Sequence, residues 1–336
     1  MTKIIIDAYG GDNAPLEVLR GARMAADEYG VLMVLCGKED EMREVAEKNN
    51  ISLAGMEIAH APGVMPMGGE PTDVLKAHSD SSMALGLKML AEGKGDAFVS
   101  AGSTGALVVG ASLIVKRLKG IKRPAIGTMI PNSVGAYMLM DSGANAECRP
   151  EMLLQFGIMG SAYMQKIMNM ESPRVGVVNI GAEETKGLDL QIEAGKLLHK
   201  APVNFVGNVE AREIPLGGCD VAVCDGFVGN IILKHTEGMG KLLSLEFKNI
   251  LLKNAGTKFA SIFLKDGIAA FRKKLDYAEH GGAPLMGISK PVIKAHGSSN
   301  AQAFKNAIRQ AKTVHETGVI AEISSALKQM AQEEGE

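Results

Sequence analysis

The sequence has no tryptophan, and aromatic residues make up only 4% of its 336 residues. It also lacks any apolar run near the roughly 18 residues that a membrane-spanning helix requires. The formal net charge is only -2, so no overall charge attracts nucleic acid, and we expect no nucleic acid partner. The amino terminus lacks the long apolar segment of a signal peptide, and we therefore expect a cytoplasmic protein.

Cysteine is scarce, and its spacing does not suit a metal ion. The four cysteines, Cys36, Cys148, Cys219 and Cys224, form no CxxC pair. This pattern predicts reduced thiols in a reducing compartment and no metal site. The GxGxxG fingerprint of dinucleotide binding is missing as well, so we expect no cofactor.

What the sequence does contain is a regular alternation of short apolar runs and longer amphipathic stretches. The apolar runs predict strands at residues 3–8, 31–36, 96–100, 125–130, 136–141, 174–179, 203–207, 220–224 and 291–295. The amphipathic stretches predict helices at residues 14–29, 38–48, 104–118, 150–168, 184–198 and 300–315. The alternation predicts a doubly wound, mostly parallel α/β sheet, in one compact catalytic unit that spans residues 1–336.

One segment, residues 227–276, interrupts this alternation with two helical stretches joined near residues 253–257. It predicts a projecting helical pair. Its second stretch places Phe259, Ile262 and Phe263 on one side, followed by Leu264. Reversible membrane contact is one interpretation of this cluster, since lysines flank it, and a dimer contact or plain core is the other.

Glycines and polar side chains follow several predicted strands, where ligands of parallel sheets bind. After the first strand come Asp7, Gly10, Gly11 and Asp12, which suit either close approach of an anion to the backbone or a tight turn. After residues 96–100 come Ser103, Thr104 and Gly105 at the start of a helix. These hydroxyls predict either a phosphate contact or an N-cap.

Four further loops repeat this arrangement. Their candidate residues are Asp141 and Asn145, then Lys186, then Asp225, Gly229 and Asn230, and finally His296 and Ser298. Lys186 is predicted at a helix start, where the helix dipole disfavours a cation unless an anion binds there, although a solvated lysine is the alternative. The aspartates are equally suited to capping, and His296 to a structural hydrogen bond.

A basic run follows the helix predicted after Thr104. It contains five cations in eight residues, namely Lys116, Arg117, Lys119, Lys122 and Arg123. Such a run is typical of a solvated surface, but it also suits docking of an acidic protein.

Seven of these segments together resemble the acyl-acyl carrier protein:phosphate acyltransferase family. They are DAYGGDNAP, SAGSTGALVVGA, RLKGIKRPAIG, DSGANAECRPEMLLQFGIMGSAYM, NIGAEETKG, DVAVCDGFVGN and HGSSNAQAF. The resemblance implies an isocitrate dehydrogenase-like fold, a homodimer, and the formation of acyl phosphate from inorganic phosphate and an acyl thioester of acyl carrier protein. It also implies a downstream glycerol-3-phosphate acyltransferase as a partner. The apolar cluster of the helical pair, and not the resemblance, is the basis for expecting peripheral association with the inner face of the membrane.

The sequence departs from the family pattern at three positions. Tyr9, Asn13 and Ser142 stand where the family usually has methionine, histidine and valine. Because position 13 is an asparagine here, we assign it no acid or base role.

These residues lead to a hypothesis for the site. Gly10, Gly11, Ser103 and Thr104 hold phosphate, and Lys186 neutralises its charge and that of the tetrahedral intermediate. Asn230 and His296 orient the thioester, and Asp225 orients one of them. Two rivals remain, which are a short-chain phosphate acyltransferase that uses acyl-coenzyme A and a non-catalytic scaffold that docks on membranes.

Overall fold

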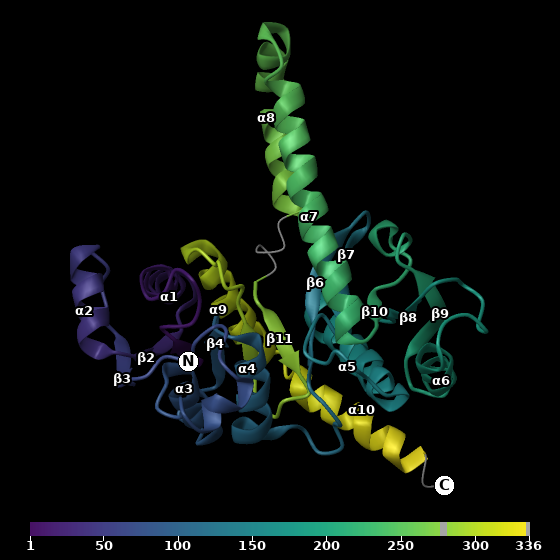
Figure 1. Ribbon diagram of the computed structural model, residues 1–336, viewed down its shortest axis with the longest axis horizontal. Helices are drawn as coiled ribbons and strands as arrows, with labels where there is room; N and C mark the ends of the chain where they lie inside the picture. Colours follow the sequence, from purple (N-terminus) through teal and green to yellow (C-terminus); the bar gives the residue numbers. More distant parts are fainter. Residues whose placement is uncertain (276–280, 334–336) are drawn as a thin grey trace.

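The computed structural model describes residues 1–275 and 281–333 of the chain. Helices surround two β-sheets, and one pair of long helices projects from the body of the molecule (Figure 1). The predicted fold class, mostly parallel α/β with a projecting helical pair, is therefore confirmed. The sequence predicted one sheet, and the structure has two.

The larger sheet contains seven strands. They are β1 (Lys3–Asp7), β2 (Leu32–Gly37), β3 (Met56–His60), β4 (Ala97–Ser100), β5 (Ala125–Ile126), β11 (Ala283–Met286) and β12 (Val292–Lys294). Their order is β3-β2-β1-β4-β12-β11-β5, with β11 antiparallel to both neighbours and the other pairs parallel. The loops after β1, β4 and β12 consequently meet at one edge of the sheet.

Helices cover both faces of this sheet. They include α1 (Leu16–Tyr29), α2 (Glu39–Lys48), α3 (Ser82–Ala91), α4 (Thr104–Gly110), which continues as a π-helix (Ala111–Lys116), and α9 (Ala301–Glu316). Ile4 and Ile6 of β1 pack in one cluster with α1 and α9, whereas Ile5 packs in another with α3. Because successive strand side chains point to opposite faces, a continuous apolar run fits a strand buried on both sides.

The smaller sheet contains β6 (Thr128–Asn132), β7 (Gly135–Met140), β8 (Arg174–Asn179), β9 (Asn204–Glu210) and β10 (Val221–Val223). Their order is β6-β7-β10-β8-β9, with only the β6–β7 pair antiparallel. The helices α5 (Pro150–Met168), α6 (Asp189–Leu198) and α10 (Val319–Glu333) belong to this half, and α10 packs against α5.

The chain passes from the larger to the smaller sheet at Gly127, between β5 and β6. A Cβ atom at this position would lie 3.1 Å from the terminal methyl carbons of Met138 and Met140. The strand predicted at residues 125–130 is broken in two here, because residues 125–126 pair with β11 and residues 128–132 pair with β7. All strands of the smaller sheet lie between residues 128 and 223. In the order of the chain they come after β5 and before β11, although β5 and β11 are paired neighbours in the larger sheet.

Two antiparallel helices, α7 (Gly226–Leu251) and α8 (Ala255–Leu275), form the projection, which we call the hairpin (Figure 1). At its turn, the Asn254 side chain accepts the Thr257 backbone N–H, and the Thr257 hydroxyl accepts the Asn254 N–H. Such reciprocal bonds satisfy backbone donors at a helix start. The predicted end of the hairpin, residue 276, lies outside the described residues.

Apart from two short 3-10 helices, at Pro71–Leu75 and Ile214–Leu216, four elements were not predicted, which are β3, β11, α3 and α10. β3 is an edge strand of half-buried and exposed residues, so it lacks the apolar run that marked the other strands. β11 has four residues, one of them Pro284, and pairs antiparallel with its neighbours. Neither element carries a strong local pattern, and both depend on the strands beside them.

Candidate active site

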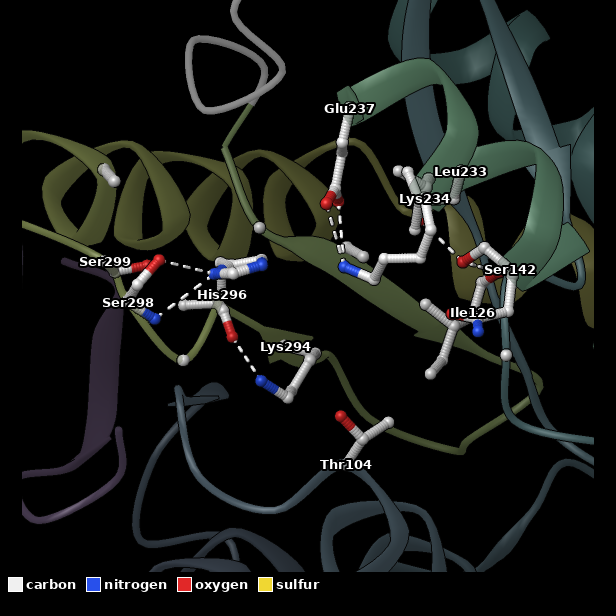
Figure 2. Close-up of a pocket in the computed structure, with 18 of the residues that line it drawn as sticks. Thr104, Ile126, Ser142, Leu233, Lys234, Glu237, Lys294, His296, Ser298 and Ser299 are labelled. Atoms are coloured by element: carbon white, nitrogen blue, oxygen red, sulfur yellow. Dashed lines mark hydrogen bonds and ion pairs between the residues drawn. The ribbon is translucent and has the colours of Figure 1, made fainter. Parts of the chain in front are cut away.

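A cleft of about 860 Å³ lies between the two sheets, where the carboxyl ends of β1, β4 and β12 face the loops of the smaller sheet and α7 (Figure 2). Five of the residues predicted from the sequence line it, namely Asp12, Thr104, Asn230, His296 and Ser298. The six predicted loops do not share one sheet edge, because three of them follow strands of each sheet.

The glycines after β1 allow three loops to pack together. A Cβ atom on Gly10 would lie 2.6 Å from both the Asp7 carboxylate and the Gly102 nitrogen. Gly11 has a φ of +101°, and a Cβ atom there would lie 2.9 Å from the Gly297 carbonyl oxygen. The Asp12 N–H donates to that carbonyl at 2.8 Å. The loop after β1 is thereby fixed against the loops after β4 and β12.

Asp7 is buried beneath these loops and does not line the cleft. Its carboxylate accepts hydrogen bonds from the Ser82 and Ser100 hydroxyls, each at 2.6 Å. Burial raises the pKa of this carboxyl, although both serine hydrogen bonds oppose the shift. The geometry gives Asp7 a role in holding β1, β4 and α3 together.

In the loop after β4, Ser103 is buried and its side chain makes no capping hydrogen bond to α4. Thr104 lines the cleft, and Gly105 lies against Pro71, whose Cγ would be 2.8 Å from an added Cβ atom. The side-chain N-cap interpretation therefore does not describe Ser103. Thr104 is the hydroxyl that a ligand in the cleft would meet.

The end of β12 brings a lysine that the sequence reasoning missed. Lys294 lines the cleft, and its ammonium group donates to the carbonyls of Ala101, at 3.3 Å, and Ala295. Burial lowers its pKa from 10.5 to about 8, against the opposing effect of Asp7 and Asp12. A lysine at the end of a buried apolar strand was the signal that could have identified it.

His296 follows two residues later and lies beside Ser298 (Figure 2). Its Nδ1 atom accepts the Ser298 backbone N–H at 3.2 Å and lies 2.9 Å from the Ser298 hydroxyl. Burial and the charge of Lys234 lower the pKa of His296. With Nδ1 accepting, the neutral ring carries its proton on Nε2.

On the opposite side of the cleft, Asp141 organises the loop after β7. This buried carboxylate accepts the backbone N–H groups of Ile126, Gly143, Ala144 and Asn145, and also the Asn145 side-chain amide. Asn145 donates in addition to the Pro124 carbonyl at 2.7 Å. Both residues are fully engaged in shaping the loop, whereas the neighbouring Ser142 and Gly143 line the cleft.

The start of α7 is seated on this loop. Asp225 caps the helix by accepting the Val228 N–H at 2.8 Å. A Cβ atom on Gly229 would lie 1.9 Å from the Asp141 carbonyl oxygen, so only glycine lets the helix approach so closely. This close contact positions Asn230 at the cleft. Asp225 and Gly229 thus support the site without lining it.

One turn further along α7, Lys234 and Glu237 also line the cleft and form an ion pair of 2.9 Å. Figure 2 shows them on the wall formed by α7, with Lys294 on the wall formed by β12 and Thr104 near Lys294. The sequence reasoning missed this pair as well. Their i, i+3 spacing just beyond Asn230 was the available signal.

Lys186 lies elsewhere. It is exposed in the loop after β8, three residues before α6 begins at Asp189, and it does not line the cleft. The prediction that it sits at a helix start is therefore wrong. The helix predicted from residue 184 begins later because residues 180–188 form an irregular loop, in which Asn179 accepts the Ile180 N–H and donates to the Lys186 carbonyl.

The two predicted surfaces are exposed. All five cations of the basic run are exposed, and they extend from Lys116, the last residue of the π-helix, to Arg123, shortly before β5. On α8, Phe259, Phe263 and Leu264 are 66%, 77% and 52% exposed, so they are not core of this chain. The side chain of Ile262 lies outside the described residues. Within residues 1–275 and 281–333, no helix is long and apolar enough to cross a membrane.

Comparison with known proteins places the chain in a family. The sequence profile described as fatty acid synthesis protein matches residues 2–322. A protein of Alkaliphilus oremlandii called phosphate acyltransferase is 45% identical over 334 residues, covering 99% of this chain and all of the relative. A protein of the same name from Thermoanaerobacterium thermosaccharolyticum is 44% identical and covers 97% of each chain.

Solved structures share the fold at low identity. A phosphotransacetylase from Streptococcus pyogenes superposes with a TM-score of 0.65 and 17% identity, covering 95% of this chain and 94% of its own. A 4-hydroxythreonine-4-phosphate dehydrogenase from Klebsiella pneumoniae gives a TM-score of 0.54 at 12% identity, covering 94% and 99%. With nearly its whole length matched by the profile and by relatives above 40% identity, the chain belongs to the fatty acid synthesis protein family.

Proposed function

We propose that this protein transfers a fatty acyl group from acyl carrier protein to inorganic phosphate and releases acyl phosphate. The observation that carries the proposal is the cleft, where two lysines, a histidine and a threonine hydroxyl from both halves of the molecule surround a space large enough for phosphate and a thioester. The full-length relatives named phosphate acyltransferase support the same reaction.

The chemistry asks for positioning and charge neutralisation more than for a covalent intermediate. An oxygen of hydrogen phosphate attacks the thioester carbonyl carbon, forming a C–O bond. The tetrahedral intermediate then collapses, the C–S bond breaks, and the thiolate takes the proton that phosphate gives up. Cations beside the phosphate reduce its repulsion from the developing oxyanion, which lowers the barrier.

The residues of the cleft suit these steps. Thr104 and the loop after β4 offer donors to phosphate, while Asn230 offers an amide to the thioester. His296, with its proton on Nε2, can donate to the carbonyl oxygen or to the departing sulfur. Asp225 acts only through α7, whose first turn it caps.

Acyl carrier protein is the proposed donor because of the family resemblance, and the basic run offers a surface on which it could dock. Lys122 and Arg123 are exposed and precede β5, whose Ile126 lines the cleft. An acidic protein bound there would hold its thioester arm close to the opening. Lys116, Arg117 and Lys119 extend the same surface.

The direct test supplies a long-chain acyl thioester of acyl carrier protein with and without phosphate and measures acyl phosphate. Phosphate-dependent product is expected. A preference for acetyl- or butyryl-coenzyme A would favour the short-chain rival, and the absence of product from every thioester would leave the scaffold.

The hairpin carries a second proposal, namely contact of a cytoplasmic protein with the inner face of the membrane. Phe259, Phe263 and Leu264 are exposed on α8 beside Lys258 and Lys265. A larger fraction of the intact protein than of Phe263→Asp should co-sediment with anionic liposomes. Equal sedimentation would contradict membrane contact, and a loss of dimers in Phe263→Asp would assign these side chains to a homodimer contact.

Membrane contact would also suit the fate of the product. Acyl phosphate is a reactive mixed anhydride, and a glycerol-3-phosphate acyltransferase is the proposed enzyme that consumes it.

A further inference from the structure

The side chain of Lys294 lies in an unusual place for a lysine. It ends β12, which is flanked by β4 and β11 in the middle of the larger sheet, and it points into the cleft instead of into solvent (Figure 2). It contacts the loop after β4, which also carries Thr104. Both groups therefore meet whatever occupies this corner of the cleft.

The hydrogen bonds of Lys294 leave part of its capacity unused. An ammonium group has three N–H donors. Two of them reach the carbonyls of Ala101 and Ala295. Neutral carbonyls do not compensate the charge, and within the described part of the chain no carboxylate forms an ion pair with Lys294. The third donor and the full positive charge are available to an anion.

The nearby carboxylates do not replace such an anion. Asp7 influences Lys294 electrostatically, but its oxygens are occupied by Ser82 and Ser100. Asp12 also favours the charged form of Lys294 from the loop after β1. Together they do not offset burial, which still lowers the pKa of Lys294 to about 8. A partly desolvated ammonium group in a cleft is stabilised when an anion binds beside it.

We propose that Lys294 binds the inorganic phosphate substrate, with Lys234 contacting the same anion from α7. This assignment rests on the proposed function, because it names the residues that hold one of its two substrates. Lys234 is near enough for its charge to affect both Lys294 and His296. Since the two lysines come from different walls, phosphate would bridge the two halves of the molecule.

The proposal predicts proton uptake when phosphate binds. The charged groups that face Lys294 are Asp7 and Asp12 on the β1 side, Lys234 and Glu237 on α7, and His296 after β12. Bound phosphate adds negative charge to this set and raises the pKa of Lys294. At about pH 8.5, where inorganic phosphate is already dianionic, Lys294 then takes up a proton.

Calorimetry with phosphate alone tests this without any acyl donor. Phosphate is titrated into the protein in two buffers of different ionisation enthalpy, and the difference between the two binding enthalpies gives the number of protons taken up. The intact protein should take up protons. Lys294→Met should bind phosphate roughly tenfold more weakly or worse and take up none. Lys290→Met is the matched control, since Lys290 precedes the same strand but donates to the Leu90 carbonyl away from the cleft. Unchanged binding and proton uptake in Lys294→Met would overturn the proposal.

Steady-state kinetics provide the second test. Lys294→Met should raise the KM for phosphate by roughly tenfold or more and leave the KM for the acyl donor nearly unchanged, and Lys294→Arg should restore part of the loss. A phosphate KM that changes in Lys186→Met instead would contradict the assignment. If the intact protein binds phosphate through Lys294 but forms no acyl phosphate, the proposed reaction fails while the phosphate site stands.

Discussion

Single residues around the cleft divide into those that line it and those that hold its loops in place. Asp7 and Asp141 look like ligand-binding residues in the sequence, since each ends a strand before a glycine-containing loop. In the structure both are buried and saturated with internal hydrogen bonds. We therefore expect any contribution of theirs to activity to be indirect, through the shape of the loops.

Asp141 provides the first prediction. Asp141→Ala leaves four buried or half-buried N–H groups and the Asn145 amide without their acceptor, and we expect the free energy of unfolding to fall by about 3 kcal/mol. Urea unfolding measures the change. Asp40→Ala, at an exposed position on α2, should shift stability by less than about 1 kcal/mol. Similar losses in both variants would argue against this role of Asp141.

Lys294 provides the second prediction, which concerns stability without phosphate. Because its pKa is about 8 in the folded protein and 10.5 in its ordinary state, the unfolded chain binds more protons between these values. The contribution of Lys294 to stability is therefore unfavourable below about pH 8 and improves as the pH rises towards 10.5.

Unfolding of the intact protein and Lys294→Met should be compared at both ends of this range. The intact protein should gain stability relative to the variant as the pH increases. A difference between the two proteins that does not depend on pH would contradict the shifted pKa.

The sequence located the loops around the cleft better than it located the side chains that line it. Thr104, Asn230 and His296 were predicted and line the cleft. Lys186 was predicted as a site residue because it lies in a loop that follows a strand. Lys294 was not predicted as a site residue because it falls within the strand predicted at residues 291–295. Local sequence cannot show which lysine points into a cleft, because that depends on how distant strands are arranged.

At the scale of elements, α7 belongs both to the wall of the cleft and to the hairpin. Its first turns carry Asn230 and Lys234, while its outer turns expose apolar side chains such as Leu242, Leu245 and Ile250. A continuous helix of 26 residues transmits any tilt along its length. The contact between the start of α7 and Asp141 therefore sets the position of the cleft wall that α7 forms. It also sets the direction in which the hairpin projects.

Gly229 provides the third prediction. In Gly229→Ala the new methyl group meets the Asp141 backbone oxygen, so α7 must shift, and we expect more than a tenfold loss of kcat/KM together with lower stability. Gly238→Ala, on the same helix with no neighbour within 4 Å, should keep activity and gain about 0.5–1 kcal/mol. Normal activity in Gly229→Ala would show that the close contact is not needed.

Most elements were predictable because they carry strong local patterns. Residues 150–168 and 174–179 were predicted with the bounds that α5 and β8 have. The helical pair was likewise evident from its length and its lack of strands. β3 and β11 were missed because they form mainly through pairing with neighbours, which no short segment encodes.

At the scale of the whole molecule, the division into two sheets decides where the cleft lies. The sequence predicted one sheet because the chain through Gly127 reads as a continuous strand. The chain divides at this glycine because Ala125 and Ile126 pair with β11, whereas residues 128–132 pair with β7. The cleft follows from that separation, since it lies between the two sheets.

The basic run provides the fourth prediction, at this same scale. Reversing the charge of Lys122 and Arg123 together should raise the KM for acyl carrier protein thioesters several-fold at low salt, with little effect on coenzyme A thioesters. Lys200→Glu, on the surface of the smaller-sheet half, serves as the control. An unchanged KM for the carrier protein at low salt would remove the run from the docking surface.

The central position of β12 also bears on protein synthesis. This strand lies between β4 and β11 in the larger sheet, yet it follows the whole smaller sheet and the hairpin in the chain. A nascent chain that has not reached residue 294 leaves the edge of β4 unpaired and lacks the lysine at the end of β12. Premature termination between residues 100 and 294 therefore yields a product that exposes an aggregation-prone edge of β4 and lacks Lys294, the proposed phosphate-binding residue.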